Sequence, residues 1–275
     1  MSALAPLIFT AQDVLPAQRM DISALTPQRL AGLPLKEIMT LSLPCGKRRL
    51  SVADVFTVQG EDTANIIIKG AVSRFDRMGA TMSEGSLMVE GDAGAYLGQG
   101  MTGGLITVKG AVGIFAAAQM RGGAIDISGD AGDFLGAAVP GEMQGMAGGQ
   151  VRVRGNVGHR AGDRMRRGAI LIEGRVGDYA GSRMLAGTLM ALKGCGSHPG
   201  YGMRRGTLIF PNLNAIPATF NGGDRQTFGV LTLLFRSLQK LGGGFAQLPT
   251  EPIVVQRYLG DRSGDGRGEI IVAPL

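Results

Sequence analysis

Glycine recurs along this chain at a fixed interval, and that interval restricts the possible folds more than any other feature of the sequence. Seven glycines align at a spacing of 19 residues, except for one spacing of 26 that equals 19 plus a seven-residue insertion around residues 139–145. They are Gly85, Gly104, Gly123, Gly149, Gly168, Gly187 and Gly206. Self-similarity at a fixed period of about 20 residues is typical of proteins built from stacked repeats.

The pattern inside each repeat indicates short strands joined by glycine corners. Apolar residues stand at offsets two and four from the first glycine, as in Leu87 and Val89, and such alternation is typical of strands. Further glycines at offsets six, nine and thirteen mark corners where the backbone needs a positive φ or approaches a neighbour. At offset sixteen we expect flexible methionines to fill the centre of the stack. They are Met101, Met120, Met165, Met184 and Met203, with Met82 in the matching place before Gly85.

Such a repeat cannot bury its own apolar face, so identical coils must stack with each strand paired to its equivalents above and below. The sequence therefore predicts an all-β chain, a right-handed parallel β-helix or solenoid of about seven 19-residue coils over residues 63–210. The segment 65–70 is expected to be a degenerate first coil.

The two ends of a solenoid need covers. We expect residues 1–62 to form an N-terminal cap of short strands with a short helix near Pro27–Leu30. Residues 211–275 should form the other cap, with strands at 253–259 and 269–272. Apolar residues at helical spacing predict an amphipathic helix over residues 227–241, which we expect to cover the C-terminal end of the solenoid.

Composition excludes several classes of protein. The 46 glycines do not fall at every third residue, which excludes collagen. The two cysteines form no CxxC pair, so neither a disulfide framework nor an iron–sulfur site is expected, and a reducing cytoplasm fits best. The N-terminal segment lacks the charged leader of a signal peptide, and no apolar run is long enough to predict a membrane span.

Few motifs indicate chemistry, and we expect neither catalytic residues nor a metal site in this chain. The GxGxxG match at residues 98–103 is interpreted as a product of the repeat, since no helix is expected after it. His159 and His198 lie in coils that are not adjacent, and Cys195 stands at an inward offset typical of a core residue. At offset eleven, aromatic residues form a ladder that Arg160 interrupts, which we interpret as corner packing, with an exposed stripe for a partner as the alternative. Its members are Tyr96, Phe115, Phe134, Tyr179 and His198.

The net charge of +6 is unevenly placed. Residues 146–205 hold 11 Lys and Arg against 3 Asp and Glu, which indicates a local anionic partner. Stacking should align seven arginines beside the methionine corner, either as solvated charge, as salt bridges to a neighbouring subunit, or as a track for an extended polyanion. These candidate site residues are Arg121, Arg164, Arg166, Arg167, Arg183, Arg204 and Arg205. Nucleic acid is not expected, because no binding motif is present and only 5% of residues are aromatic.

Coils such as GGLITVKGAVGIFAAAQMR and GGQVRVRGNVGHRAGDRMR resemble a glycine-rich β-helix shared by two families. One is the C-terminal domain of the glutamate synthase large subunit, and the other is the C subunit of formylmethanofuran dehydrogenase. The resemblance covers about residues 63–210 and is specific for the fold. The chain length and the C-terminal stretch YLGDRSGDGRGEIIV favour the second family.

The resemblance implies a non-catalytic subunit in a one-carbon enzyme complex. In the formyltransferase/hydrolase version, amidohydrolase-like, formyltransferase and dehydrogenase-B-like subunits would be partners and would hold the active sites. Such a complex moves a formyl group from formyl-tetrahydromethanopterin to a methanofuran-type carrier and hydrolyses it to formate. The carrier has a polyglutamate tail, which the arginines could guide. No cofactor is expected on this chain itself.

Three other functions remain open from sequence. One is the C subunit of a molybdenum or tungsten formylmethanofuran dehydrogenase. A free-standing β-helix enzyme is the second, although such enzymes usually display acids and aromatics along a groove, whereas this chain displays arginines. The third is a glutamate synthase-like regulatory or scaffold module.

Overall fold

The computed structural model of the chain describes residues 4–13, 16–70, 72–264 and 266–275. The predictions made for residues 1–3 and 14–15 of the N-terminal cap, residue 71 of the repeat and residue 265 of the C-terminal cap lie outside the described residues.

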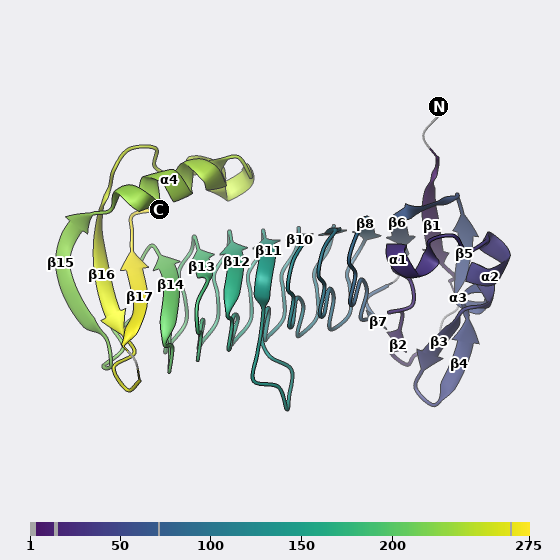
Figure 1. Cartoon of the computed structure of the whole chain (residues 1–275), viewed down its shortest axis with the longest axis horizontal. Helices are drawn as coiled ribbons and strands as arrows, with labels where there is room; N and C mark the ends of the chain where they lie inside the picture. Colours follow the sequence, from purple (N-terminus) through teal and green to yellow (C-terminus); the bar gives the residue numbers. More distant parts are fainter. Residues whose placement is uncertain (1–3, 14–15, 71, 265) are drawn as a thin grey trace.

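Strands from successive repeats lie side by side in one large sheet (Figure 1). The sheet has 13 strands, is mostly parallel, and follows the order β15-β16-β17-β14-β13-β12-β11-β10-β9-β8-β6-β1-β5. The repeat contributes β6 (Asp62–Lys69), β8 (Ser86–Glu90), β9 (Leu105–Val108), β10 (Ala124–Ile127), β11 (Ala147–Val153), β12 (Arg167–Ile172), β13 (Thr188–Ala191) and β14 (Arg205–Phe210). The strand expected at residues 65–70 is confirmed and extends the stack toward the N-terminus, because β6 pairs in parallel with β8.

The register is set by a row of inward apolar side chains, one from each parallel strand. The row is Leu7, Ile66, Leu87, Ile106, Ile125, Val151, Ile170, Leu189, Leu208 and Ile270. Each member is at most 2% exposed, and full burial of such a side chain is worth about 1.5–3 kcal/mol. A slip of one residue would turn the whole row toward solvent, so the apolar period fixes the register.

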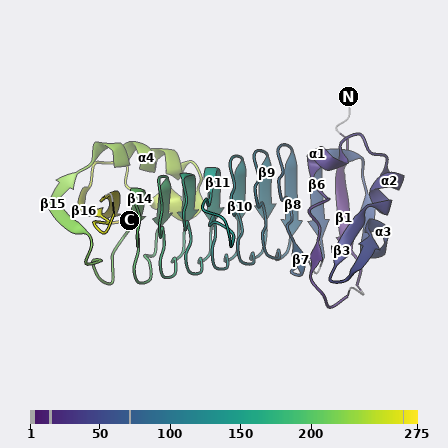
Figure 2. The same cartoon turned by 60° about the horizontal axis from the view of Figure 1, so that its bottom comes forward.

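A second row of parallel contacts runs along the opposite part of each coil. Single-residue bridges join Ala93, Val112, Ala131, Val157, Val176 and Cys195. The same core holds a column of fully buried methionines, one from each coil: Met82, Met101, Met120, Met146, Met165, Met184 and Met203. Met146 completes the column because the insertion ends before it. Figure 2 shows the resulting narrow coils stacked in a row, an arrangement consistent with a solenoid.

Glycines at offsets six and nine make room for polar side chains of the preceding coil. Asp133, for example, accepts a hydrogen bond from the backbone N–H of His159 at 2.7 Å. A Cβ on Gly158 would overlap the same carboxylate. The same contact joins Asp76 to Ala95, Asp92 to Ala111, Asp130 to Asn156, Asn156 to Arg175 and Asp178 to Ser197. These side chains satisfy backbone donors that turn away from the sheet.

The N-terminal region extends the sheet and adds a second, smaller one. Strand β1 (Pro6–Ala11) pairs in parallel with β6, and β5 (Phe56–Gln59) closes this edge antiparallel to β1. The second sheet has the order β4-β3-β2-β7. Its strands are β2 (Met20–Asp21), β3 (Ser42–Cys45), β4 (Arg48–Ser51) and β7 (Phe75–Asp76). The predicted helix α1 (Pro27–Leu30) is confirmed, whereas α2 (Leu35–Thr40) and α3 (Val52–Val55) were not predicted.

The C-terminal region corrects one prediction. Helix α4 (Gly229–Gln239) and strands β16 (Val254–Gly260) and β17 (Arg267–Val272) are confirmed, and η1 (Gly243–Gln247) and β15 (Asn221–Thr227) are additional. The expected place of the helix was wrong. Helix α4 packs on the outer face of the last repeat strands (Figure 1), against Leu171, Met190 and Ile209. Strands β17, β16 and β15 cover the end of the repeat instead, because β17 continues the parallel sheet from β14.

Candidate functional site: arginines beside the methionine corner

The predicted arginines are positioned by the backbone that follows each buried methionine. Arg121, Arg166 and Arg204 directly follow Met120, Met165 and Met203. The backbone N–H of each donates to the carbonyl of the methionine one coil earlier, at 2.7, 2.7 and 2.8 Å. Because the methionine side chain points into the core, the next side chain points outward. The stack therefore brings these three arginines to one corner.

Five of the seven arginines are exposed and form no ion pair with another described residue. We call them the arginine row: Arg121, Arg166, Arg167, Arg204 and Arg205. Unpaired guanidinium groups in water retain all five donors for a carboxylate or phosphate. The row can therefore bind an anionic partner without first breaking an internal ion pair.

The row alternates along the stack. In the coils between Arg121, Arg166 and Arg204, the equivalent positions are Ala147 and Leu185. Two strand spacings, or about 10 Å, separate Arg121 from Arg166 and Arg166 from Arg204. The positive charge is therefore repeated at every second coil, and each repeat is separated by a small or apolar side chain.

Arg164 and Arg183 differ from the row because both contact Asp163, which is 4% exposed. Arg183 donates from Nε and Nη2 to Oδ1 at 3.0 and 2.9 Å, and from Nη2 to Oδ2 at 3.1 Å. The hydroxyl of Ser182 also donates to Asp163. This pairing joins adjacent coils, and it leaves Arg183 with fewer free donors than the arginine row.

The structure adds one arginine that the sequence interpretation missed. Arg205 is paired with Arg267 at the start of β14 and β17, so Arg267 extends the row beyond the last repeat. A signal was present in the sequence. Arg167, Arg205 and Arg267 each precede a glycine and then an apolar strand, in the stretches RGAILI, RGTLIF and RGEIIV.

The aromatic ladder at offset eleven forms two stacks in which each side chain contacts the one in the next coil. In the first, Arg77 lies 5.2 Å from the ring of Tyr96, Tyr96 stacks on Phe115 at 5.3 Å, and Phe115 stacks on Phe134 at 4.7 Å. In the second, Arg160 lies 4.7 Å from the ring of Tyr179, which stacks on His198 at 5.0 Å. Arg160 stands at the break between the two stacks, as the sequence indicated, and its guanidinium packs on the ring of Tyr179.

The cysteines are buried in the core, and the histidines contact side chains or backbone of neighbouring coils. Both cysteines are buried, and burial raises the pKa of Cys195 to about 12, so its place in the core is confirmed. Nδ1 of His159 accepts a hydrogen bond from the backbone N–H of Asp178 at 3.0 Å, whereas His198 stacks on Tyr179. Within the described ranges, no three His, Cys, Asp or Glu side chains gather as a metal site would require.

Comparison with known proteins identifies the family. No family model matches the chain. Over 80 residues the chain is 41% identical to the C subunit of the formyltransferase/hydrolase complex Fhc of Methylorubrum extorquens. It also superposes, with a TM-score of 0.90 and 40% identity, on a chain of the crystal structure of the FhcABCD complex from the same organism in complex with methylofuran. That superposition covers 96% of this chain and 98% of the other. The chain belongs to the family of formyltransferase/hydrolase complex C subunits.

More distant members of this C-subunit family come from archaea. The chain is 34% identical over 102 residues to the C subunit of the tungsten-containing formylmethanofuran dehydrogenase 2 of Methanothermobacter marburgensis, which is 35% of this chain and 37% of that protein. The match to the Methylorubrum protein spans 29% of this chain and 30% of the relative. The sequence alignments therefore span about a third of the curated relatives, whereas the structural superposition spans nearly all of the solved chain.

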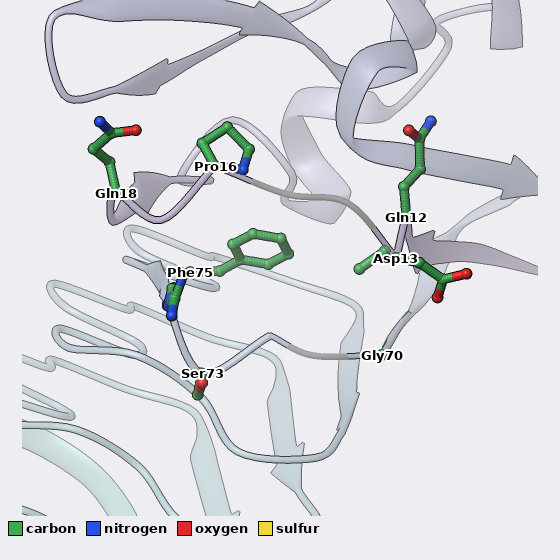
Figure 3. Close-up of a pocket in the computed structure, with 9 residues that line it drawn as sticks. Gln12, Asp13, Pro16, Gln18, Gly70, Ser73 and Phe75 are labelled. Atoms are coloured by element: carbon green, nitrogen blue, oxygen red, sulfur yellow. The ribbon is translucent and has the colours of Figure 1, made fainter.

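Two further features of this member of the C-subunit family are the character of its helices and a pocket near its N-terminus. In the part of the chain that the structure describes, no helix combines the length and apolar character needed to cross a bilayer. A pocket of about 370 Å³ is lined by Ala11, Gln12, Asp13, Pro16, Gln18, Gly70, Ser73, Arg74 and Phe75 (Figure 3). The ring of Phe75 extends toward the middle of the pocket, and Gln12 and Asp13 lie at the other end of the pocket. None of its lining residues belongs to the arginine row.

Proposed function

We propose that the chain is the structural subunit of a formyltransferase/hydrolase complex that converts formyl groups to formate in one-carbon metabolism. The observation that supports this most strongly is the superposition on a chain of FhcABCD, because it extends over 96% of this chain at 40% identity. The sequence matches to the archaeal dehydrogenase subunits are 27–34% identical, against 41% for the C subunit of Fhc, so the hydrolase version is the better supported of the two.

Its partners would be amidohydrolase-like, formyltransferase and dehydrogenase-B-like subunits, assembled in the cytoplasm. A methanofuran-type carrier would act within this complex rather than as a cofactor of this chain. The crystal structure of FhcABCD is a complex with methylofuran, which supports a carrier of this class. In this proposal residues 63–210 form a right-handed parallel β-helix of about seven coils between caps at 1–62 and 211–275.

A structural rather than catalytic role is supported by how the chain uses its polar side chains. Acidic and imidazole groups that could transfer protons instead hold neighbouring coils together, as Asp133 and His159 do. Asp163 and Glu173 are each paired with an arginine. Groups already held in such contacts stabilise the stack, and this leaves the chemistry to partner subunits.

Native purification of the tagged chain, followed by mass spectrometry of its partners and metal analysis, tests this proposal. We expect a formyltransferase and an amidohydrolase-like subunit, without molybdenum or tungsten. Molybdenum or tungsten together with iron–sulfur partners would assign the chain to the dehydrogenase. A monomer without partners would contradict a subunit role and favour a free-standing β-helix enzyme, and glutamate synthase-like partners would favour the scaffold module.

We also propose that the arginine row binds the polyglutamate tail of the carrier. Its exposed, unpaired guanidinium groups support binding to carboxylates, and their spacing of about 10 Å suits an extended chain rather than a compact anion. Arg164 and Arg183 would flank this track, since both already contact Asp163.

A pair of charge reversals tests the track in the assembled complex. Arg166→Glu with Arg204→Glu should weaken binding of a polyglutamate peptide at least tenfold and reduce its dependence on salt. Lys109→Glu with Lys193→Glu is the matched control, since it changes the net charge equally at exposed positions outside the row. Unchanged affinity in an intact mutant complex would reject the track. Loss of one partner subunit would instead assign the row to a protein contact.

A further inference from the structure

The second aromatic stack ends at an exposed ring. Tyr179 covers one face of His198, with the rings 5.0 Å apart and inclined by 10°. The next position at this offset would be 11 residues after Gly206, and it is Pro217. Proline has no aromatic ring, so the chain itself does not continue the stack. His198 is therefore the last ring of the ladder, and it is exposed.

A pocket of about 470 Å³ lies beside this last ring. Its walls come from the coil end at residues 196–201, from the segment 214–219 and from Asp261. Tyr179 stacks on one face of His198 and does not line the pocket, so the other face of the ring is the one available to the pocket. His198, Pro199, Tyr201, Ile216 and Pro217 are among the lining residues.

We propose that this pocket receives an aromatic side chain from a partner subunit, which stacks on His198 as the next member of the ladder. Ring-to-ring distances within the ladder are 4.7 to 5.3 Å, and a ring at that distance beyond His198 would lie in the pocket. Its volume is of the size that small organic groups occupy, and its mixture of flat and aliphatic walls suits a planar apolar ring.

The carboxylate in the pocket wall is already hydrogen-bonded within this chain, which favours an uncharged ring over a cation as the occupant. Asp261 is the carboxylate in the wall, and it is 2% exposed. Its Oδ2 accepts from the backbone N–H of Gly202 at 2.8 Å, and its Oδ1 accepts from the N–H and the hydroxyl of Ser263 at 2.8 and 2.7 Å. With both oxygens already bonded, Asp261 has little capacity left for a basic side chain.

The rim favours a protein as the source of the ring. Tyr201 is 58% exposed and Ile216 is 52% exposed, and both line the pocket. Exposed large apolar side chains around a pocket are typical of a contact in which an aromatic anchor is buried. This inference rests on the proposed function, because that function requires partner subunits.

Three variants and one cross-link test the site in the co-expressed complex. Ala218→Trp should fill the pocket from its own wall, and Tyr201→Ser removes an aromatic wall. Ile114→Ser is the matched control, since Ile114 is a similarly exposed apolar residue (45%) in a coil away from the pocket. We expect the two pocket variants to reduce the yield of assembled complex, measured by native mass spectrometry, at least tenfold. The control should assemble like the wild type.

Thermal unfolding of each isolated variant separates lost contact from misfolding, and a Tm close to that of the wild type is expected for all three. A photo-reactive p-benzoylphenylalanine in place of Tyr201 should cross-link, within the purified complex, to a partner peptide that contains an aromatic residue. Normal assembly of both pocket variants, or a cross-link only within this chain, would overturn the inference. Failure of the wild type to assemble at all would overturn the proposed function instead.

Discussion

The carboxylate of Asp133 fills the space that a Cβ atom on Gly158 would occupy, one coil further along the stack. The same carboxylate accepts the backbone N–H of His159, the residue after that glycine. The glycine and the acid are thus two parts of one contact between coils, and this contact recurs along the repeat.

Gly158→Ala should destabilise the chain by about 2–4 kcal/mol, because the new methyl group displaces the carboxylate and breaks its hydrogen bond. Chemical unfolding monitored by circular dichroism measures the change. Gly229→Ala is the control, since a Cβ there meets no other atom within 4 Å and Gly229 lies in a helix. The combination of Gly158→Ala with Asp133→Ala should cost less than the sum of the two single changes. Strict additivity would contradict the shared contact.

Arg152 joins the turn after helix α4 to the sheet. It donates to Glu173 at 3.0 and 2.6 Å and to the carbonyls of Leu241 and Gly242 at 2.6 and 3.0 Å. Arg152→Met should cost about 3–5 kcal/mol, because Glu173 would remain largely buried without its partner.

Hydrogen exchange locates the effect of Arg152→Met, and we expect faster exchange in residues 229–247 than in the repeat. Arg154→Met is a suitable control, because Arg154 is more exposed and, among the described residues, its ion pair is with Asp126 alone, at 3.4 Å. Unchanged exchange in the helix would show that the apolar contacts of α4 hold it without the arginine.

Acid should weaken the C-terminal cap through Asp261. Burial raises the pKa of Asp261, but hydrogen bonds from Ser263, Gly202 and Thr219 outweigh burial and leave the pKa below its ordinary value. Because the folded pKa lies below the unfolded value, this group stabilises the fold above about pH 4 and loses that contribution as the pH falls further.

The Tm of Asp261→Asn should therefore fall less steeply than that of the wild type below about pH 4. Asp224→Asn, at an exposed position of β15, should retain the slope of the wild type. Equal slopes for wild type and Asp261→Asn would mean that Asp261 does not carry the acid sensitivity.

Cys195 should resist thiol reagents in the folded chain. Burial raises its pKa to about 12, with Asp178 adding to this effect and Arg175 opposing it. The reactive thiolate is therefore scarce at neutral pH, and access is blocked as well. Iodoacetamide at about pH 8, followed by peptide mass spectrometry, should label Cys195 only after denaturant is added. Rapid labelling of the native chain would contradict this.

The repeat could be predicted because its signals are local. Glycine spacing and two-residue alternation locate every repeat strand, and paired strands fix the corner where the arginine row lies. Arg183 and Asp163 lie 20 residues apart, about one coil, so their ion pair could also have been anticipated.

The position of α4 needed information from distant parts of the chain. Offset three changes from Thr107 and Asp126 in early coils to Leu171, Met190 and Ile209 in later ones, which marks a covered outer face. Arg152 and the carbonyl of Leu241 are 89 residues apart, and no periodicity links them. The pocket beside His198 depends on how a nonrepetitive segment folds back, so sequence spacing could not reveal it.

The continuous row of inward apolar residues gives the repeat a fixed length. Ten parallel strands, from β1 to β17, hold one inward row between Leu7 and Ile270. At about 4.8 Å a strand, the row spans about 43 Å. A partner bound at each end would be held apart by a stiff spacer whose length changes only in whole coils. Removal of one 19-residue coil would bring the two partners closer by one strand spacing and would leave both contact surfaces intact.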